Sequence, residues 1–100
     1  MTERTLILPL KREYFEAILF NRKAEEYRLV TKHWRTRLDG KTFDRIVLTL
    51  GYPARDDHSR RLIRPWQGYT VKWITHPHFG PAPVEVYAIK VAEPTQKELM

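Results

Sequence analysis

The apolar residues of this 100-residue chain lie in short segments, and this shortness limits the folds that it can form. Five or six of the segments have the length and the alternating or continuous apolar character of β-strands. Pro9 places the first of them at a sheet edge or a strand end. The expected strands are residues 5–10, 25–30, 45–52, 60–66, 69–75 and 84–91.

Only two short helices are expected beside these strands. Residues 11–20 repeat apolar side chains at helical spacing, and Asn21 follows where a helix end tolerates a left-handed residue. Thr31 is a suitable N-cap for a second helix that ends at Gly40, with Trp34 on its inner side. So little helix covers only part of a sheet. We therefore predict an α+β, mainly β fold: a small, closed or nearly closed β-barrel of five to six strands with two short helices.

The length is that of one domain, which we assign to residues 1–100 with a frayed tail at 94–100. No apolar run approaches the roughly 18 residues that a membrane span needs, so we expect no membrane association. The chain has no cysteine, which excludes disulfide bonds and thiolate sites and suits a reducing cytoplasm.

The net charge of +6 is confined to one part of the sequence. Residues 21–41 contain seven basic side chains against three acidic ones, and residues 42–66 contain five against three. A confined excess indicates a surface for a polyanion such as RNA, whereas an inert basic surface is the alternative.

The segment 21–28, "NRKAEEYR", is the densest run of charge in this basic region. On a strand, Glu26 and Arg28 leave the same face with their Cα atoms about 7 Å apart. Glu26 can then hold Arg28 or Lys23, which keeps several donors fixed in one cleft. Arginine offers a planar fork to phosphate or a base edge, and lysine offers a point charge. A structural ion-pair cluster is the alternative interpretation.

This segment resembles the signature of the ASCH domain, a member of the PUA-like group of small β-barrels. In that family Gly-x-Lys-x-x-Glu-x-Arg follows the first helix; Lys23, Glu26 and Arg28 match it, and Asn21 stands in place of the glycine. The order of elements over residues 5–92 is also similar to the family. The resemblance implies an RNA- or nucleotide-binding cleft beside the motif.

The same resemblance implies an enzyme as the alternative, with Lys23 and Glu26 as catalytic residues. Some ASCH proteins are ribonucleases, and others are amidohydrolases that act on acetylated cytidine with a threonine nucleophile three residues after the motif lysine. Glu26 occupies that position here, and a carboxylate cannot replace a hydroxyl nucleophile without changing the chemistry. Glu26 could instead act as a general base if burial raises its pKa.

Further candidate ligand-binding residues lie in the second half of the chain. The stretch "RRLIRPW" interleaves arginines with Trp66, the mixture of cations and rings that single-stranded nucleic acid prefers. We expect Arg61, Arg64 and Lys72 to extend the basic surface, and Trp66 to face either the ligand or the core.

Two small clusters contain metal-ligating residue types, but neither has a second pair at ligand spacing. They are the pair His76 and His78 and the run Asp56, Asp57 and His58. We expect no metal site and no cofactor. A proton-transfer role for His76 or His78 stays open, since histidine titrates near neutral pH. The oligomeric state is not indicated.

Overall fold

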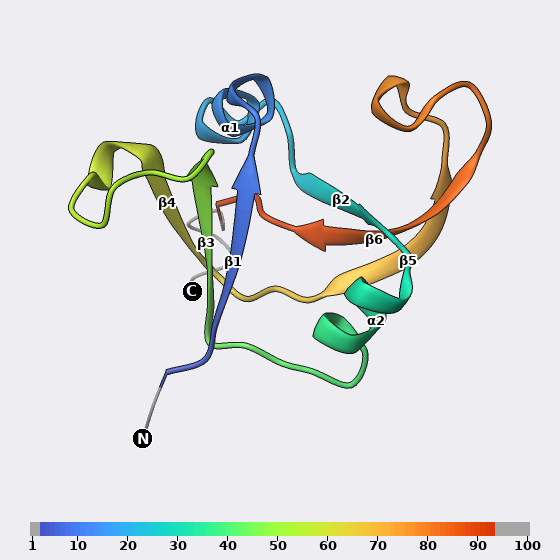
Figure 1. Cartoon of the computed structure of the whole chain (residues 1–100), viewed down its shortest axis with the longest axis horizontal. Helices are drawn as coiled ribbons and strands as arrows, with labels where there is room; N and C mark the ends of the chain where they lie inside the picture. The colour runs from blue at the N-terminus through green and yellow to red at the C-terminus, as the bar shows by residue number, and fades with distance from the viewer. Residues whose placement is uncertain (1–2, 94–100) are drawn as a thin grey trace.

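The computed structural model describes residues 3–93, which form six strands and two helices (Figure 1). In chain order these are β1 (Thr5–Leu10), α1 (Arg12–Leu19), β2 (Glu25–Leu29), α2 (Lys32–Leu38), β3 (Arg45–Leu50), β4 (Arg61–Pro65), β5 (Tyr69–Ile74) and β6 (Val84–Lys90). Single 3-10 turns at His58–Arg60 and Pro77–Phe79 lie before β4 and after β5. Each expected element is confirmed, with ends that differ by one or two residues. Neither helix has the length and apolar character that crossing a membrane requires.

The strands belong to two three-stranded sheets, with the orders β1-β3-β4 and β2-β6-β5 (Figure 1). β1 pairs parallel with β3, so that Leu6 lies opposite Ile46, and β4 pairs antiparallel with β3 on its other side. In the second sheet β6 lies between β2 and β5 and is antiparallel to both. β1 is therefore an edge strand, which agrees with the predicted place of Pro9.

The predicted α+β, mainly β class is confirmed, but the closed barrel is not found among the described strands. No backbone ladder joins the two sheets within residues 3–93. A side chain connects their edges instead, because the guanidinium of Arg28 on β2 donates to the carbonyl of Pro9 on β1 at 3.0 Å. The tail predicted at residues 94–100 lies outside the described residues.

Both sheets contribute to one apolar core, which the two helices also join. Because side chains alternate along each strand, alternate residues of β1, β3 and the second half of β6 enter this cluster. Burial of apolar surface stabilises the fold by roughly 25 cal/mol per Å². The largest fully buried members are Tyr87, Leu6, Leu8, Ile18, Leu38, Ile46, Leu48 and Ile89.

The ends of the two helices position the charged segment that enters β2. Asn21 has the predicted left-handed conformation, with φ at 60°, and it reverses the chain after α1. The amide of Lys23 then donates to the carbonyl of Ala17 at 3.1 Å, which fixes the approach to β2. After β2, the Thr31 hydroxyl accepts from the amide of Trp34 at 3.3 Å and caps α2 as predicted.

Candidate functional site

A cavity of about 540 Å³ lies beside β2 and is lined by five separate segments of the chain. These are the end of β1, the start of α1, the charged motif, the start of α2 and the turn after β5. Three cationic side chains and one carboxylate line it, together with aromatic rings. The charged residues are Lys11, Lys23, Arg28 and Glu26; the ring-bearing residues are Tyr14, Tyr27, His33, Trp34, His76, His78 and Phe79. The cavity therefore combines excess positive charge with flat apolar surfaces.

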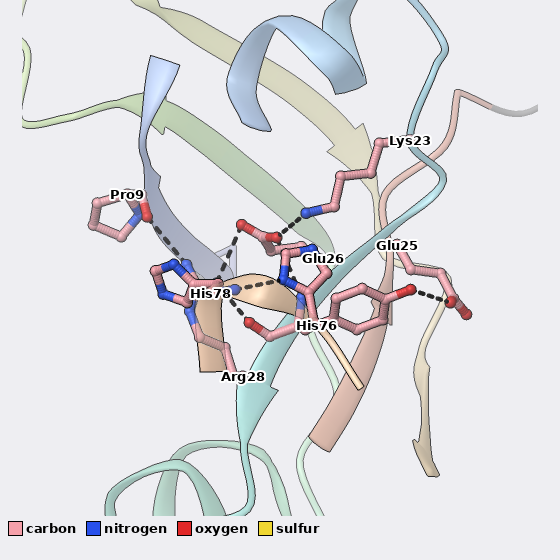
Figure 2. A network of polar contacts seen from close by, with 8 residues as sticks. Pro9, Lys23, Glu25, Glu26, Arg28, His76 and His78 are labelled. Atoms are coloured by element: carbon pink, nitrogen blue, oxygen red, sulfur yellow. Dashed lines mark hydrogen bonds and ion pairs between the residues drawn. The ribbon is translucent and has the colours of Figure 1, made fainter. Parts of the chain in front are cut away.

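Glu26 is buried, with 4% of its surface exposed, and it holds both cations of the motif. Its Oε1 accepts from Nζ of Lys23 at 2.6 Å and from the amide of Tyr27 at 3.2 Å. Its Oε2 lies 3.2 Å from Nη1 of Arg28 (Figure 2). The structure thus brings the three motif residues together as predicted. Two cations face one carboxylate, so the cluster keeps a positive charge while the buried carboxylate is fully compensated.

The guanidinium group of Arg28 donates most of its hydrogen bonds to backbone carbonyls. Its Nη1 donates to the carbonyl of Tyr27 at 2.9 Å, and its Nη2 donates to the carbonyl of Pro9 at 3.0 Å (Figure 2). Its guanidinium carbon also lies 5.4 Å from the ring centroid of Trp34. Arg28 therefore links β1, β2 and the start of α2, and its first task is to hold the walls of the cavity together.

The ammonium group of Lys23 has N–H donors that no acceptor within residues 3–93 uses. Its Nζ lies 4.2 Å from the ring centroid of Tyr14 and 5.4 Å from that of Tyr27, which are cation–π distances. An ammonium group carries three N–H donors, and within residues 3–93 one of them has a hydrogen-bond acceptor, the Glu26 carboxylate. Lys23 can therefore bind an acceptor atom of a ligand without losing Glu26.

The two tyrosines beside Lys23 are neutral rings at physiological pH. Burial is the main cause that raises the pKa of Tyr14, and the negative charges of Glu13 and Glu26 raise it further. Burial also raises the pKa of Tyr27, with a second contribution from Glu25. Neither phenol is ionised near pH 7, so these rings offer stacking surfaces and not phenolate bases.

The turn at residues 76–79 forms one wall of the cavity, and the sequence did not predict this position for the turn. Nδ1 of His76 accepts from the amide of His78 at 3.1 Å, which fixes the orientation of the first ring (Figure 2). The ring centroids of His76 and His78 lie 6.0 Å and 5.8 Å from that of Tyr14. The sequence signal was a histidine pair in a proline-rich loop, but nothing in it placed that loop beside Lys23. Within residues 3–93 no group of three or more His, Asp or Glu side chains is arranged to hold a metal ion.

The ring of Trp34 has two roles: the expected contact with the core, and an unexpected place in the cavity wall. It packs against the core cluster, and it also lines the cavity at the start of α2. Cations lie on its ring, since the guanidinium carbons of Arg28 and Arg37 are 5.4 Å and 4.8 Å from its centroid. These contacts fix the ring as part of the cavity wall.

Four of the predicted ligand-binding residues lie outside the lining of this cavity: Arg61, Arg64, Trp66 and Lys72. Arg61 donates to three backbone carbonyls of the loop that precedes β4, at 2.8, 2.9 and 3.4 Å. Arg64 is buried, with 8% of its surface exposed, so it adds little to the basic surface. Trp66 packs against the core and lies edge-on to Phe43, with ring centroids 5.0 Å apart. The contacts of Arg61 and Trp66 therefore give both residues a role in the structure.

Lys72 lies near the motif but outside the cavity lining. Its Nζ is 2.8 Å from Oε1 of Glu25 and 5.8 Å from the ring centroid of Tyr27. The hydrogen bond to Glu25 is the main cause that raises the pKa of Lys72. Lys23 and Lys72 thus both contact the ring of Tyr27, and Lys72 neutralises the carboxylate beside it.

Comparison with protein-family models, curated proteins and solved structures finds no match for the chain. Any functional assignment therefore depends on the motif at residues 21–28 and on the geometry around it. Two features of that geometry bear on function: the positive charge left over at Glu26, and the aromatic rings that surround Lys23.

Proposed function

We propose that this chain is an ASCH domain protein of the PUA-like group that binds RNA or a nucleotide in the cavity beside β2. One observation carries the proposal: the cavity joins unneutralised positive charge to aromatic surfaces around a buried carboxylate. Nucleotides present the complementary groups, a flat base and an anionic phosphate. The absence of cysteine suits a protein of this kind that works in the cytoplasm.

Each part of the cavity has a task in this proposal. The rings of Tyr14 and Tyr27 offer stacking surfaces for a base, and the free donors of Lys23 bind a carbonyl or a phosphate oxygen. Glu26 fixes the position of Lys23, and Arg28 keeps the cavity open by connecting the edges of the two sheets. Lys11 adds charge at the cavity lining.

A hydrolase is the second candidate, and a specific observation favours it. Lys23 and Glu26 lie 2.6 Å apart in the cavity lining, and both residue types serve as proton-transfer groups in enzymes. The hydrogen bonds of Glu26 favour binding instead. Both of its oxygens already hold partners, which leaves little capacity to accept a proton from substrate. A binding protein is therefore the better-supported function.

Titration of labelled RNA against the protein at several salt concentrations tests the proposal. About four phosphate contacts give a slope of about −3 in a plot of log affinity against log salt, at roughly 0.7 per contact for single strands. Homo-oligomers of each base, about eight nucleotides long, cover the usual size of such sites. Absence of binding at low salt, or binding that salt does not weaken, would exclude the proposed function.

A further inference from the structure

A second cavity, of about 510 Å³, adjoins the first one at the start of β2. Its lining includes Arg22, Lys23 and Glu25 from the motif, Gln67 from the link between β4 and β5, and Lys90 at the end of β6. Lys23 and Tyr27 line both cavities. A ligand longer than one nucleotide can therefore extend from one cavity into the other over these two side chains.

The second cavity is also positively charged. Arg22, Lys23 and Lys90 line it, and neither Arg22 nor Lys90 forms an ion pair with any described residue. Glu25 is the carboxylate in its lining, and Lys72, which lies outside that lining, neutralises it at 2.8 Å. Arg22 and Lys90 are exposed in the lining, so both side chains are accessible to a phosphate.

The ring of Tyr27 lies close to two ammonium groups, those of Lys23 and Lys72, which pair with different carboxylates. Nζ of Lys23 is 5.4 Å from its centroid and Nζ of Lys72 is 5.8 Å from it, while its hydroxyl donates to Glu25 at 3.3 Å. These contacts fix the ring at the boundary of the two cavities. A strand of nucleic acid that crosses this boundary meets an aromatic surface with two cations close to it, a combination typical of single-strand binding.

We propose that the second cavity binds the phosphodiester group and the neighbouring nucleotide of an RNA strand whose base occupies the first cavity. This inference rests on the proposed function and makes it more specific, because it assigns polynucleotide chains, and not free nucleosides, as the ligand class. Arg22 and Lys90 bind the phosphodiester group in the second cavity. A free nucleoside has no group that reaches these cations.

The test compares each of the four nucleosides with its homodinucleoside monophosphate (uridine with UpU, and so on) by NMR titration of the folded protein. The dinucleoside monophosphate binds about tenfold more tightly, as one charge-assisted contact to phosphate provides. The salt slope steepens by roughly 0.7, since one more phosphate is contacted. Amide resonances of Lys90 and Ala92 shift with the dinucleoside monophosphates and stay unchanged with the nucleosides.

Variants with matched controls identify the residues that cause the tenfold gain in affinity. Replacing Arg22 and Lys90 together by alanine removes the tenfold gain and leaves nucleoside affinity unchanged, whereas Arg55→Ala, an exposed base outside both cavities, preserves the gain. Equal affinity of nucleoside and dinucleoside monophosphate for the unaltered protein overturns the inference and leaves the proposed function standing. Failure of both probes to bind rejects the proposed function as well.

Discussion

The ammonium nitrogen of Lys23 lies 2.6 Å from Oε1 of Glu26, and 16% of the lysine side chain and 5% of the glutamate side chain are exposed. Arg28 completes the cluster at 3.2 Å from the other carboxylate oxygen. The two cations have different surroundings, because Arg28 donates to backbone carbonyls of both sheets and Lys23 faces aromatic rings. Their replacement should therefore have different consequences.

Arg28→Ala should lower the free energy of unfolding by about 3 kcal/mol, the low end for breaking a largely buried ion pair. The change removes the connection to Pro9 and one of the two cations that hold Glu26. Urea denaturation measures the effect. Arg28→Lys keeps the charge without the planar fork and should give an intermediate loss. An unchanged denaturation midpoint for Arg28→Ala would show that the link between the sheets is not important for stability.

Lys23→Met should weaken RNA binding about tenfold or more, since it removes the donors available to a ligand while preserving side-chain length. Its denaturation midpoint should fall less than that of Arg28→Ala, because the ammonium group of Lys23 donates to no backbone carbonyl within residues 3–93. Lys41→Met, an exposed lysine outside both cavities, is the matched control for loss of one charge. A large loss of stability with unchanged affinity would assign Lys23 to the structure alone.

Glu26→Gln separates a binding protein from a hydrolase. If Glu26 is a general base, the amide should reduce turnover by a factor of roughly 10² to 10⁴ with little change in affinity. We expect instead that the unaltered protein hydrolyses neither RNA nor N4-acetylcytidine, and that Glu26→Gln weakens RNA binding because Lys23 is held less firmly. Clear deacetylation of N4-acetylcytidine by the unaltered protein would contradict this view of Glu26. If the unaltered protein is inactive as expected, Glu26→Thr tests whether the threonine hydroxyl of the amidohydrolases that the motif resembles confers activity.

Tyr14→Leu and Tyr27→Leu should each weaken binding of single-stranded RNA by about 1–3 kcal/mol if the rings stack on bases. Leucine keeps most of the apolar volume and removes the flat surface. Tyr52→Leu provides the control, because Tyr52 is 91% exposed and lies outside both cavities. Equal effects of all three changes on affinity would exclude stacking in the cavity.

The raised pKa of Tyr87 predicts that the folded protein loses stability at alkaline pH. Burial is the main cause that raises the pKa of Tyr87 from 10.0 to about 12, and its hydrogen bond to Asp39 at 2.6 Å adds to the effect. The folded pKa exceeds the unfolded one, so the stabilisation is complete below pH 10 and is lost as the pH rises towards 12. Denaturation midpoints measured across this range should fall. Tyr87→Phe should remove that part of the decrease, and an identical decrease in the variant would refute the assignment.

Local sequence patterns predicted the elements of this fold well because each element has its own local signal. Asn21 and Thr31 marked helix boundaries through conformation and capping chemistry, and both have the expected geometry. The pattern could not reveal which strands pair. The parallel pairing of β1 with β3 and the two separate sheets depend on contacts between distant segments, so a barrel was expected and was not found.

The candidate site was predictable where its residues are neighbours in sequence. Lys23, Glu26 and Arg28 lie within one segment, and strand spacing alone indicated that the last two share a face. The contribution of His76 and His78 was not predictable, because it depends on how the loop after β5 folds over α1 and β2. Burial of Arg64 was hidden for a similar reason, since a strand pattern does not identify which face is covered.

β2 is an edge strand of its sheet, and this position determines when the site can form during synthesis of the chain. Among the described strands β2 pairs with β6 alone, and Glu26 lies opposite Ile89. The motif leaves the ribosome before the strand that fixes it, because β3, β4 and β5 lie between β2 and β6 in the chain. Such contacts between distant segments form late in folding. A nascent chain that lacks β6 therefore carries the charged motif without the strand that pairs with it, and the site is complete only after β6 has been synthesised.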